Sequence, residues 1–269
     1  MTSPARFLLR AIDVDVLVEV EDRELGALVQ QVAADLQIPE PADRPARVTV
    51  SGHGPWTIAS PALTHQSLDR SHALGAVLAA VNLTAVAQTT TLAFHAAVLV
   101  RGGCVVAVPG ASGNGKTTLA AALLREGWTY VTDEALSLRW RSRALVPYPR
   151  PLALSPWAAE TLGVGGVDVG GELLVRASAW STVVPACDDL PGWPHHVVSL
   201  DRAPGAAADL LAVHRTEALA ALLRRGFTHH HDAGRALTTV HQLVSEAQCW
   251  RLRLSDPREA ARFMTARLS

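Results

Sequence analysis

Nine consecutive residues carry the strongest chemical signal in this sequence. They are Gly110, Ala111, Ser112, Gly113, Asn114, Gly115, Lys116, Thr117 and Thr118, and they match G-x-x-x-x-G-K-[ST], the Walker A pattern, at every fixed position. In such a phosphate-binding loop (P-loop), backbone N–H groups and the dipole of the following helix attract phosphate oxygens. Lys116 is the only lysine in the chain, and its compact charge would reach the β- and γ-phosphates. We therefore expect this loop to bind the phosphates of a nucleotide.

The residues on either side predict the elements that would position this loop. Cys104 to Val108 is a short apolar, β-branched run that predicts a buried strand. Thr117 to Glu126 is rich in Ala and Leu and is followed by Gly127, which predicts a helix and its end. Phe94 to Val100 pairs with the buried strand as a predicted hairpin, and the P-loop follows that hairpin directly.

An acidic pair, Asp133 and Glu134, follows the next predicted strand. Ligands of α/β sheets bind at the carboxyl ends of strands, so these carboxylates should return to the edge that carries the loop. With the Thr117 hydroxyl they form a candidate Mg²⁺ site, in which one carboxylate holds metal and the other accepts a proton from an incoming hydroxyl. The alternative is an ordinary acidic pair on the surface.

Several other residues are weaker candidates. His95 lies on the strand that precedes the loop, where a histidine is more often part of the core. Arg150 lies in a proline-stiffened segment, Pro147 to Leu152, and could be aimed at a ligand or simply be exposed in a loop. His229, His230 and His231 are consecutive, so their side chains diverge, and we leave their role open.

Composition limits the kinds of partner and the compartment. The net charge is −1 and the pI is about 6.8, so we expect neither nucleic acid nor a membrane as a partner. No apolar run approaches the roughly 20 residues of a membrane-spanning helix. The three cysteines are widely spaced and odd in number, which favours reduced thiols and a cytoplasmic protein.

The 269 residues allow one large domain or two smaller ones. Mixed strand and helix patterns predict a small α+β N-terminal domain over 1–90, and residues 91–269 are predicted to be an α/β catalytic domain with a mixed sheet. Two features of that second part are secondary predictions. The glycine-rich run 163–171 is expected to be a flexible loop, and Gln248 to Leu254 an edge strand.

The stretch from His95 to Glu134 resembles the catalytic core of the HPr kinase/phosphorylase family. The shared features are His95-Ala96, the hairpin, the P-loop, the helix ending at Gly127 and the acidic pair. The short distance from loop to carboxylates also resembles phosphoenolpyruvate carboxykinase. The segment Tyr148 to Leu152 is similar to smaller HPr-kinase-like proteins of peptide natural-product clusters, including lasso peptide kinases.

This resemblance implies specific roles. Lys116 and the loop amides would hold the ATP phosphates, while Thr117 and Glu134 would approach Mg²⁺. Asp133 would accept the proton of a substrate serine, and His95 would orient phosphate or substrate. The chain carries Glu134 where the family usually has Asp.

The function expected on these grounds is an ATP- and Mg²⁺-dependent kinase. Its acceptor would be a hydroxyl, most simply a serine of a peptide or small protein such as a natural-product precursor. Two alternatives stay open at this stage: a kinase for a small-molecule hydroxyl, and a regulatory protein that binds ATP without transferring phosphate. The sequence also leaves open whether the chain forms a homo-oligomer.

Overall fold

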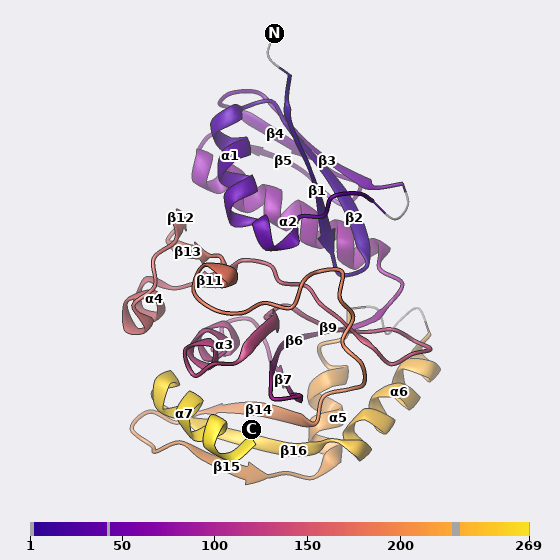
Figure 1. Ribbon diagram of the computed structural model, residues 1–269, viewed down its shortest axis with the longest axis vertical. Helices are drawn as coiled ribbons and strands as arrows, with labels where there is room; N and C mark the ends of the chain where they lie inside the picture. Colours follow the sequence, from indigo (N-terminus) through magenta and orange to yellow (C-terminus); the bar gives the residue numbers. More distant parts are fainter. Residues whose placement is uncertain (1–2, 42–43, 228–231, 269) are drawn as a thin grey trace. The chain divides into compact units, whose positions relative to one another are not determined.

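The computed structural model describes residues 3–41, 44–227 and 232–268 and shows a mixed α/β protein (Figure 1). The chain forms two compact units. The first contains Met1–Thr90, Arg150–Ala179 and Pro185–Cys187, and the second contains Thr91–Pro149, Trp180–Val184 and Asp188–Ser269. Residues 150–179 therefore cluster with the N-terminal part of the chain, and the division into a 1–90 domain and a 91–269 domain stays a prediction.

The first unit is built on a five-stranded sheet with the order β1-β2-β3-β4-β5. Its strands are β1 (Ala5–Ala11), β2 (Val14–Val20), β3 (Ala46–Ser51), β4 (Trp56–Ala59) and β5 (Thr64–Ser67), and its helices are α1 (Arg23–Val32), the short η1 (Ala34–Leu36) and α2 (Arg70–Gln88). Only β2 and β3 run parallel, because α1 and η1 connect them.

Helix α2 is the one described helix that is long and apolar enough, by length and composition alone, to cross a membrane. Seven of its residues are buried, and the helix contacts α1 and strands β3, β4 and β5 within the first unit. Core helices of folded proteins meet the same two criteria, and the packing of α2 is that of a core helix.

The remaining part of the first unit is a small three-stranded sheet with the order β11-β13-β12. Its elements are β11 (Leu152–Leu154), α4 (Pro156–Leu162), β12 (Val167–Val169), β13 (Glu172–Val175) and η2 (Ala177–Ala179). The expectation of a flexible loop over 163–171 was wrong for its second half, since β12 pairs with β13 there. The glycines at 170 and 171, both with positive φ, form the tight turn between these strands.

The second unit is built on an eight-stranded mixed sheet with the order β10-β9-β6-β7-β14-β16-β15, in which β8 also pairs with β6. Its strands are β6 (Leu92–Arg101), β7 (Cys104–Pro109), β8 (Thr129–Thr132), β9 (Ala135–Leu138), β10 (Leu145–Val146), β14 (His196–Arg202), β15 (Asp209–Ala212) and β16 (Gln248–Leu254), and its helices are α3 (Lys116–Arg125), α5 (Arg215–Leu223), α6 (Ala233–Glu246) and α7 (Pro257–Leu268). The prediction that 248–254 is an edge strand was wrong. Strand β16 lies between β14 and β15 and pairs with both.

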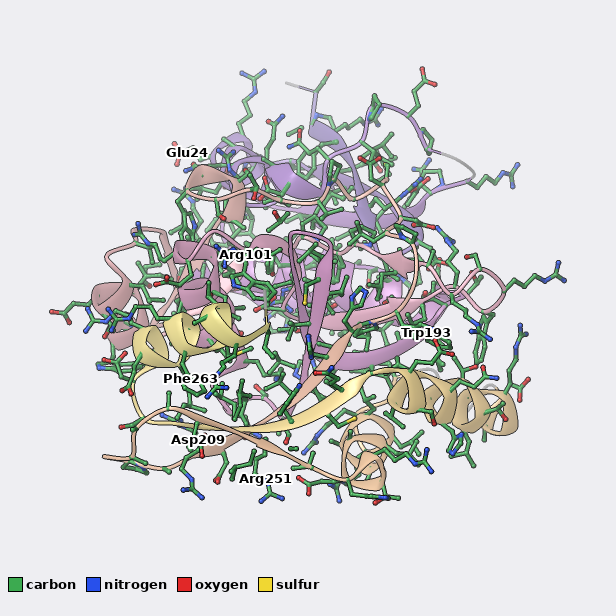
Figure 2. The ribbon with its side chains drawn as sticks, turned by 60° about the horizontal axis from the view of Figure 1, so that its bottom comes forward. Glu24, Arg101, Trp193, Asp209, Arg251 and Phe263 are labelled. Atoms are coloured by element: carbon green, nitrogen blue, oxygen red, sulfur yellow. The ribbon has the colours of Figure 1, made fainter. Side chains whose placement is uncertain are left out.

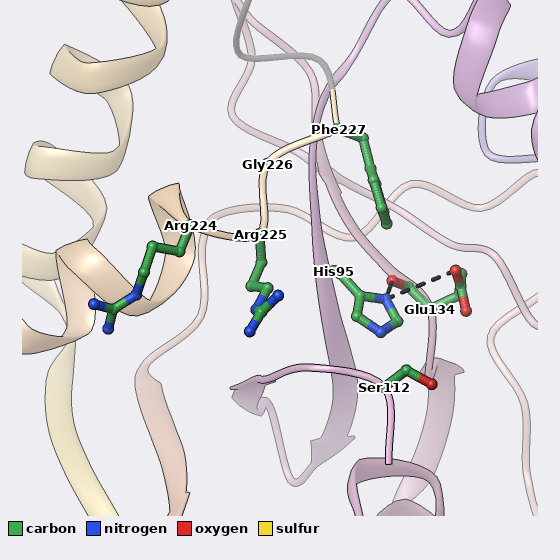
Figure 3. Close-up of a pocket in the computed structure, with 7 residues that line it drawn as sticks. All are labelled: His95, Ser112, Glu134, Arg224, Arg225, Gly226 and Phe227. Carbon is green, nitrogen blue, oxygen red and sulfur yellow. Dashed lines mark hydrogen bonds and ion pairs between the residues drawn. The ribbon is translucent and has the colours of Figure 1, made fainter. Parts of the chain in front are cut away.

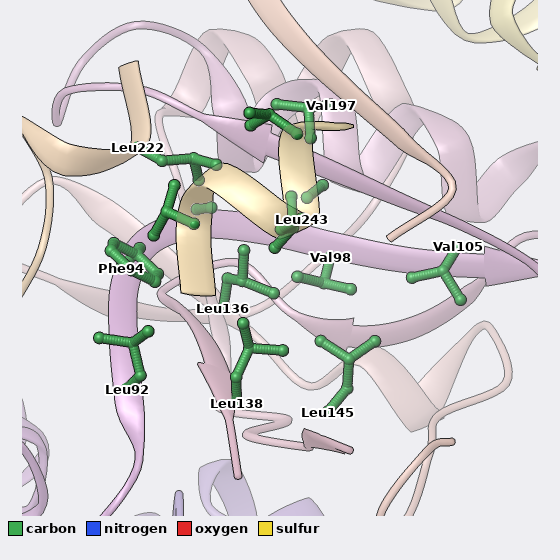
Figure 4. Packing of buried hydrophobic residues seen from close by; sticks show 14 of the residues in the cluster. Leu92, Phe94, Val98, Val105, Leu136, Leu138, Leu145, Val197, Leu222 and Leu243 are labelled. Carbon is green, nitrogen blue, oxygen red and sulfur yellow. The ribbon is translucent and has the colours of Figure 1, made fainter. Parts of the chain in front are cut away.

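The buried core of this unit joins one face of β6 to helices α5 and α6 (Figure 4). Every second residue of β6 belongs to it: Leu92, Phe94, Ala96 and Val98. Leu222 of α5 and Leu243 of α6 pack against them. Because side chains alternate along a strand, His95 points to the opposite face of the sheet.

Charged side chains of both signs project from the surface of the molecule, among them Glu24 of α1, Arg101 at the end of β6 and Arg251 of β16 (Figure 2). Arg251 forms an ion pair of 2.7 Å with Glu217 of α5. Both side chains of that pair are about two-fifths exposed, so the pair contributes little to stability.

Candidate functional site

The candidate site lies where two strands of the second unit end beside the start of a third. Strands β7 and β8 both run antiparallel to β6, one on each side of it, so they point the same way. Pro109, the last residue of β7, pairs with Ala96, and Thr132, the last residue of β8, pairs with Val98. The loop after β7, the acidic pair after β8 and His95 of β6 therefore meet at one edge of the sheet.

The loop after β7 has the backbone that an anion site requires. Gly113 and Gly115 have φ values of 80° and 87°, a region that residues with a Cβ seldom adopt. Helix α3 begins at Lys116, and its N-cap residue is Gly115, which has no side chain to cap the helix. The first amides of α3 have no intrahelical acceptor, and they add to the positive end of the helix dipole.

Lys116 is only 5% exposed and lies inside this loop. Its Nζ donates to the carbonyl of Ala111 at 2.8 Å and lies 3.0 Å from Nε2 of His95. Burial lowers the pKa of Lys116, and the charges of Asp133 and Glu134 oppose that shift. Arg225 adds to the lowering, which places a second positive charge within electrostatic reach of the lysine.

The two carboxylates are set by the turn between β8 and β9. The hydroxyl of Thr132 accepts hydrogen bonds from the amides of Glu134 (3.1 Å) and Ala135 (3.2 Å), which fixes the turn. The Asp133 carboxylate accepts a hydrogen bond on each oxygen. Thr117 Oγ1 donates to Oδ2 at 2.8 Å, and the buried Tyr130 hydroxyl donates to Oδ1 at 2.8 Å.

His95 connects the loop to the acidic turn. Its Nδ1 lies 2.9 Å from the carbonyl oxygen of Glu134 and 3.7 Å from Oε1 of the same residue. A carbonyl only accepts and an ammonium only donates, so these partners assign the proton to Nδ1 and the lone pair to Nε2, which faces Lys116. The ring also packs against Phe227, with the centroids 5.7 Å apart.

A pocket of about 360 Å³ opens on this edge and is lined entirely by the second unit (Figure 3). Its lining residues are His95, Ser112, Glu134, Arg224, Arg225, Gly226 and Phe227. The last four follow α5, and two backbone hydrogen bonds hold them beside β6: from the His95 amide to the Arg225 carbonyl (2.7 Å) and from the Phe227 amide to the Ala93 carbonyl (2.8 Å).

Four residues of the site carry no clear signal in the sequence that marks them as functional: Arg224, Arg225, Phe227 and Tyr130. Arg225 and Phe227 bond to β6 across some 130 residues of chain, and no local pattern in the sequence predicts such a contact. A run of two arginines and an aromatic residue directly after a helix was the one available hint.

The structure brings together Lys116, Thr117, His95, Asp133 and Glu134. Arg150 belongs to the first unit, and its role in ligand binding stays a prediction. His229, His230 and His231 lie outside the described residues. Within the described ranges, no group of three or more His, Cys, Asp or Glu side chains is arranged to hold a metal ion.

Comparison with known proteins adds little to this geometry. No protein-family model matches the chain, and no curated protein matches it. Among solved structures, the chain is similar to the Hpr(Ser) kinase/phosphatase from Coxiella burnetii, with 14% sequence identity, a TM-score of 0.32, and coverage of 65% of this chain and 86% of that chain. A TM-score of this size does not establish a shared fold, so the residues of the site carry the functional argument.

Proposed function

We propose that this protein is a cytoplasmic, ATP- and Mg²⁺-dependent kinase that transfers a phosphoryl group to the serine hydroxyl of a peptide or small protein. One observation carries the proposal: the 2.8 Å hydrogen bond from Thr117 of the loop to Asp133 of the acidic turn. It joins the anion-binding part of the site to its carboxylates. In phosphoryl transfer most of the catalysis comes from such positioning and from charge neutralisation.

The residues present fit a nucleotide triphosphate. The loop offers uncapped amides at the start of α3, and Lys116 and Arg225 supply positive charge nearby. The contacts of Lys116 with the Ala111 carbonyl and His95 are ones that phosphate oxygens can replace, because an ammonium group donates to any nearby acceptor.

The residues also fit Mg²⁺. This ion is usually held by one or two carboxylates and completes its shell with waters and substrate phosphates, so it needs no larger protein cluster. Thr117 and a carboxylate of the acidic pair would hold it, and when bound it would neutralise charge on the β- and γ-phosphates.

The choice of acceptor rests on the sequence motifs, which are similar to those of peptide-tailoring kinases. A small-molecule hydroxyl is the second candidate, because a pocket of about 360 Å³ falls in the size range of small-ligand sites. In either case the acceptor would approach through the pocket beside His95.

The test is a transfer assay with purified full-length protein, radiolabelled ATP and Mg²⁺. One arm offers an array of serine-containing peptides, and a second offers small molecules with free hydroxyl groups. Each positive peptide is repeated with serine replaced by alanine, and each reaction is repeated with EDTA. We expect label on serine peptides that is lost in both controls, with the phosphoryl group confirmed by mass spectrometry.

Labelling of small molecules alone would select the second candidate. Tight binding of ATP with no transfer to either arm would instead favour a regulatory ATP-binding protein. Failure to bind ATP in equilibrium dialysis would end the kinase proposal.

A further inference from the structure

Asp133 and Glu134 are neighbours in sequence, yet they face different surroundings. Both residues lie in the bend between β8 and β9, which the Thr132 hydroxyl fixes by accepting from the amides of Glu134 and Ala135. Asp133 is only 4% exposed and lies against Thr117 and Tyr130. The Glu134 side chain is 18% exposed and lines the pocket, which Asp133 does not (Figure 3).

We propose that Glu134 is the carboxylate that accepts the proton of the acceptor hydroxyl, and that Asp133 holds the metal together with Thr117. This inference rests on the proposed kinase function and exchanges the two roles that the sequence resemblance implies. A general base must reach the proton that it removes, and geometry takes precedence over sequence position in choosing it.

The surroundings of Asp133 suit a metal ligand. Thr117 donates to one of its oxygens and Tyr130 to the other, and carboxylate oxygens are ligands that Mg²⁺ prefers. Tyr130 is fully buried and fixes the orientation of the carboxylate, so it is a positioning residue for this ligand. The Thr117 hydroxyl beside it supplies a second oxygen of the kind that Mg²⁺ prefers.

The surroundings of Glu134 suit a base that faces a substrate. His95 donates from Nδ1 to the Glu134 carbonyl and lies 3.7 Å from its carboxylate, so the histidine holds this residue at the pocket wall. Lys116 in turn orients His95 through Nε2. His95 therefore links Glu134, the proposed base, to Lys116, which would contact the transferred phosphate.

The acceptor oxygen forms a bond to the γ-phosphorus while its proton passes to the Glu134 carboxylate. The bond from the γ-phosphorus to the β–γ bridging oxygen breaks, and the electron pair stays on ADP. Glu134 then releases the proton to solvent, which returns it to its starting form.

The decisive experiment compares Glu134→Gln with Asp133→Asn in two measurements. The first is binding of Mn²⁺ with ADP, followed by electron paramagnetic resonance, which needs no acceptor. We expect Asp133→Asn to weaken Mn²⁺·ADP binding at least about 10-fold and Glu134→Gln to change it less than about 3-fold.

The second measurement is phosphoryl transfer to the best peptide of the array or, without one, to water as slow ATP hydrolysis. We expect Glu134→Gln to lower kcat by on the order of 10²- to 10³-fold while KM for ATP stays nearly constant. Glu134→Asp keeps a carboxylate and should recover part of the rate. Circular dichroism and thermal melting verify that each variant is folded.

The inference is overturned if Glu134→Gln loses Mn²⁺·ADP binding while Asp133→Asn retains it, or if Glu134→Gln transfers at the wild-type rate. These results would leave the proposed function intact. Absence of Mn²⁺·ADP binding by the wild-type protein would instead refute the proposed function itself, and the inference with it.

Discussion

Helices α1 and α3 begin in opposite ways. At α1, the Asp22 carboxylate accepts from the amides of Glu24 (2.9 Å) and Leu25 (3.1 Å), and it also accepts from the indole of Trp56. At α3, the N-cap is Gly115 in a left-handed conformation, with no side chain to offer. One helix start is satisfied by its own unit, and the other leaves its amides available to an anion.

This difference separates stability from binding. A capped helix start stabilises the folded unit. An uncapped start lacks that stabilisation, but its amides and the positive end of its dipole can interact with an anionic ligand. Changes at the α3 start should therefore act on nucleotide handling, and changes at the α1 start should act on unfolding.

The largest effect is expected for Lys116→Ala at the start of α3. Transfer of phosphate from ATP should fall by at least about 10³-fold, because the variant lacks the charge that would neutralise the transferring group. Thermal stability should change little, since burial already disfavours the charged form of this lysine. A radiolabel transfer assay and a melting curve measure the two quantities.

A Lys116→Ala variant with normal transfer but a much lower melting temperature would reverse the comparison. It would mean that the α3 start is a structural element and that the anion site lies elsewhere.

An intermediate effect is expected for Arg225→Ala, with Arg224→Ala as the matched control. Both arginines line the pocket. The charge of Arg225 contributes to the lowered pKa of Lys116, and Figure 3 shows the side chains of Arg224 and Arg225 leaving the chain in different directions. We expect transfer to fall about 10- to 100-fold in Arg225→Ala and less than about 3-fold in Arg224→Ala.

The fold should survive both arginine changes, because the Arg225 backbone carbonyl, not its side chain, holds the segment to β6. Steady-state kinetics with ATP as the varied substrate measure the effect. Equal losses of transfer rate in the two variants would show that the number of positive charges at the pocket matters, and not the position of Arg225.

The smallest effect is expected for Asp22→Ala at the start of α1. Loss of the cap should lower the free energy of unfolding by about 1–2 kcal/mol, because two amides and the Trp56 indole lose their acceptor. Urea denaturation measures this change. ATP affinity should stay at the wild-type value, and a weakened affinity would show that the two helix starts are not independent.

The Asp22 effect should also depend on pH. Burial raises the pKa of Asp22, but hydrogen bonds from Leu25, Trp56 and Glu24 outweigh it and the net pKa is lowered. A carboxyl with a lowered folded pKa stabilises the protein above its unfolded pKa, near 4, and loses that contribution as pH falls through the folded value. The difference in unfolding free energy between wild type and Asp22→Ala should therefore shrink in acid.

Much of the site could be predicted because its signals are local. The strand, loop and helix around Lys116 each follow from a short run of residues, and the structure confirms β7 and α3. The return of Asp133 and Glu134 to the same edge followed from strand direction alone. The structure has the acidic pair at that edge, because β7 and β8 both pair antiparallel with β6.

The rest depends on contacts between distant segments. Tyr130 reads as an ordinary strand residue, and only the folded turn brings its hydroxyl to Asp133. The interior position of β16 depends on β15, a mostly exposed four-residue strand with a weak pattern. The membership of β12 in a sheet depends on pairing across a turn of two glycines.

The short segment after α5 has a consequence beyond the pocket. Strand β7 stops opposite Ala96, so the first residues of β6 would present unpaired amides and carbonyls along that side. The Arg225 and Phe227 backbone groups cover them. Without these contacts, this part of β6 would be an exposed apolar strand edge, which can pair with strands of other chains. The residues that form the pocket wall therefore also protect the protein from aggregation through this edge.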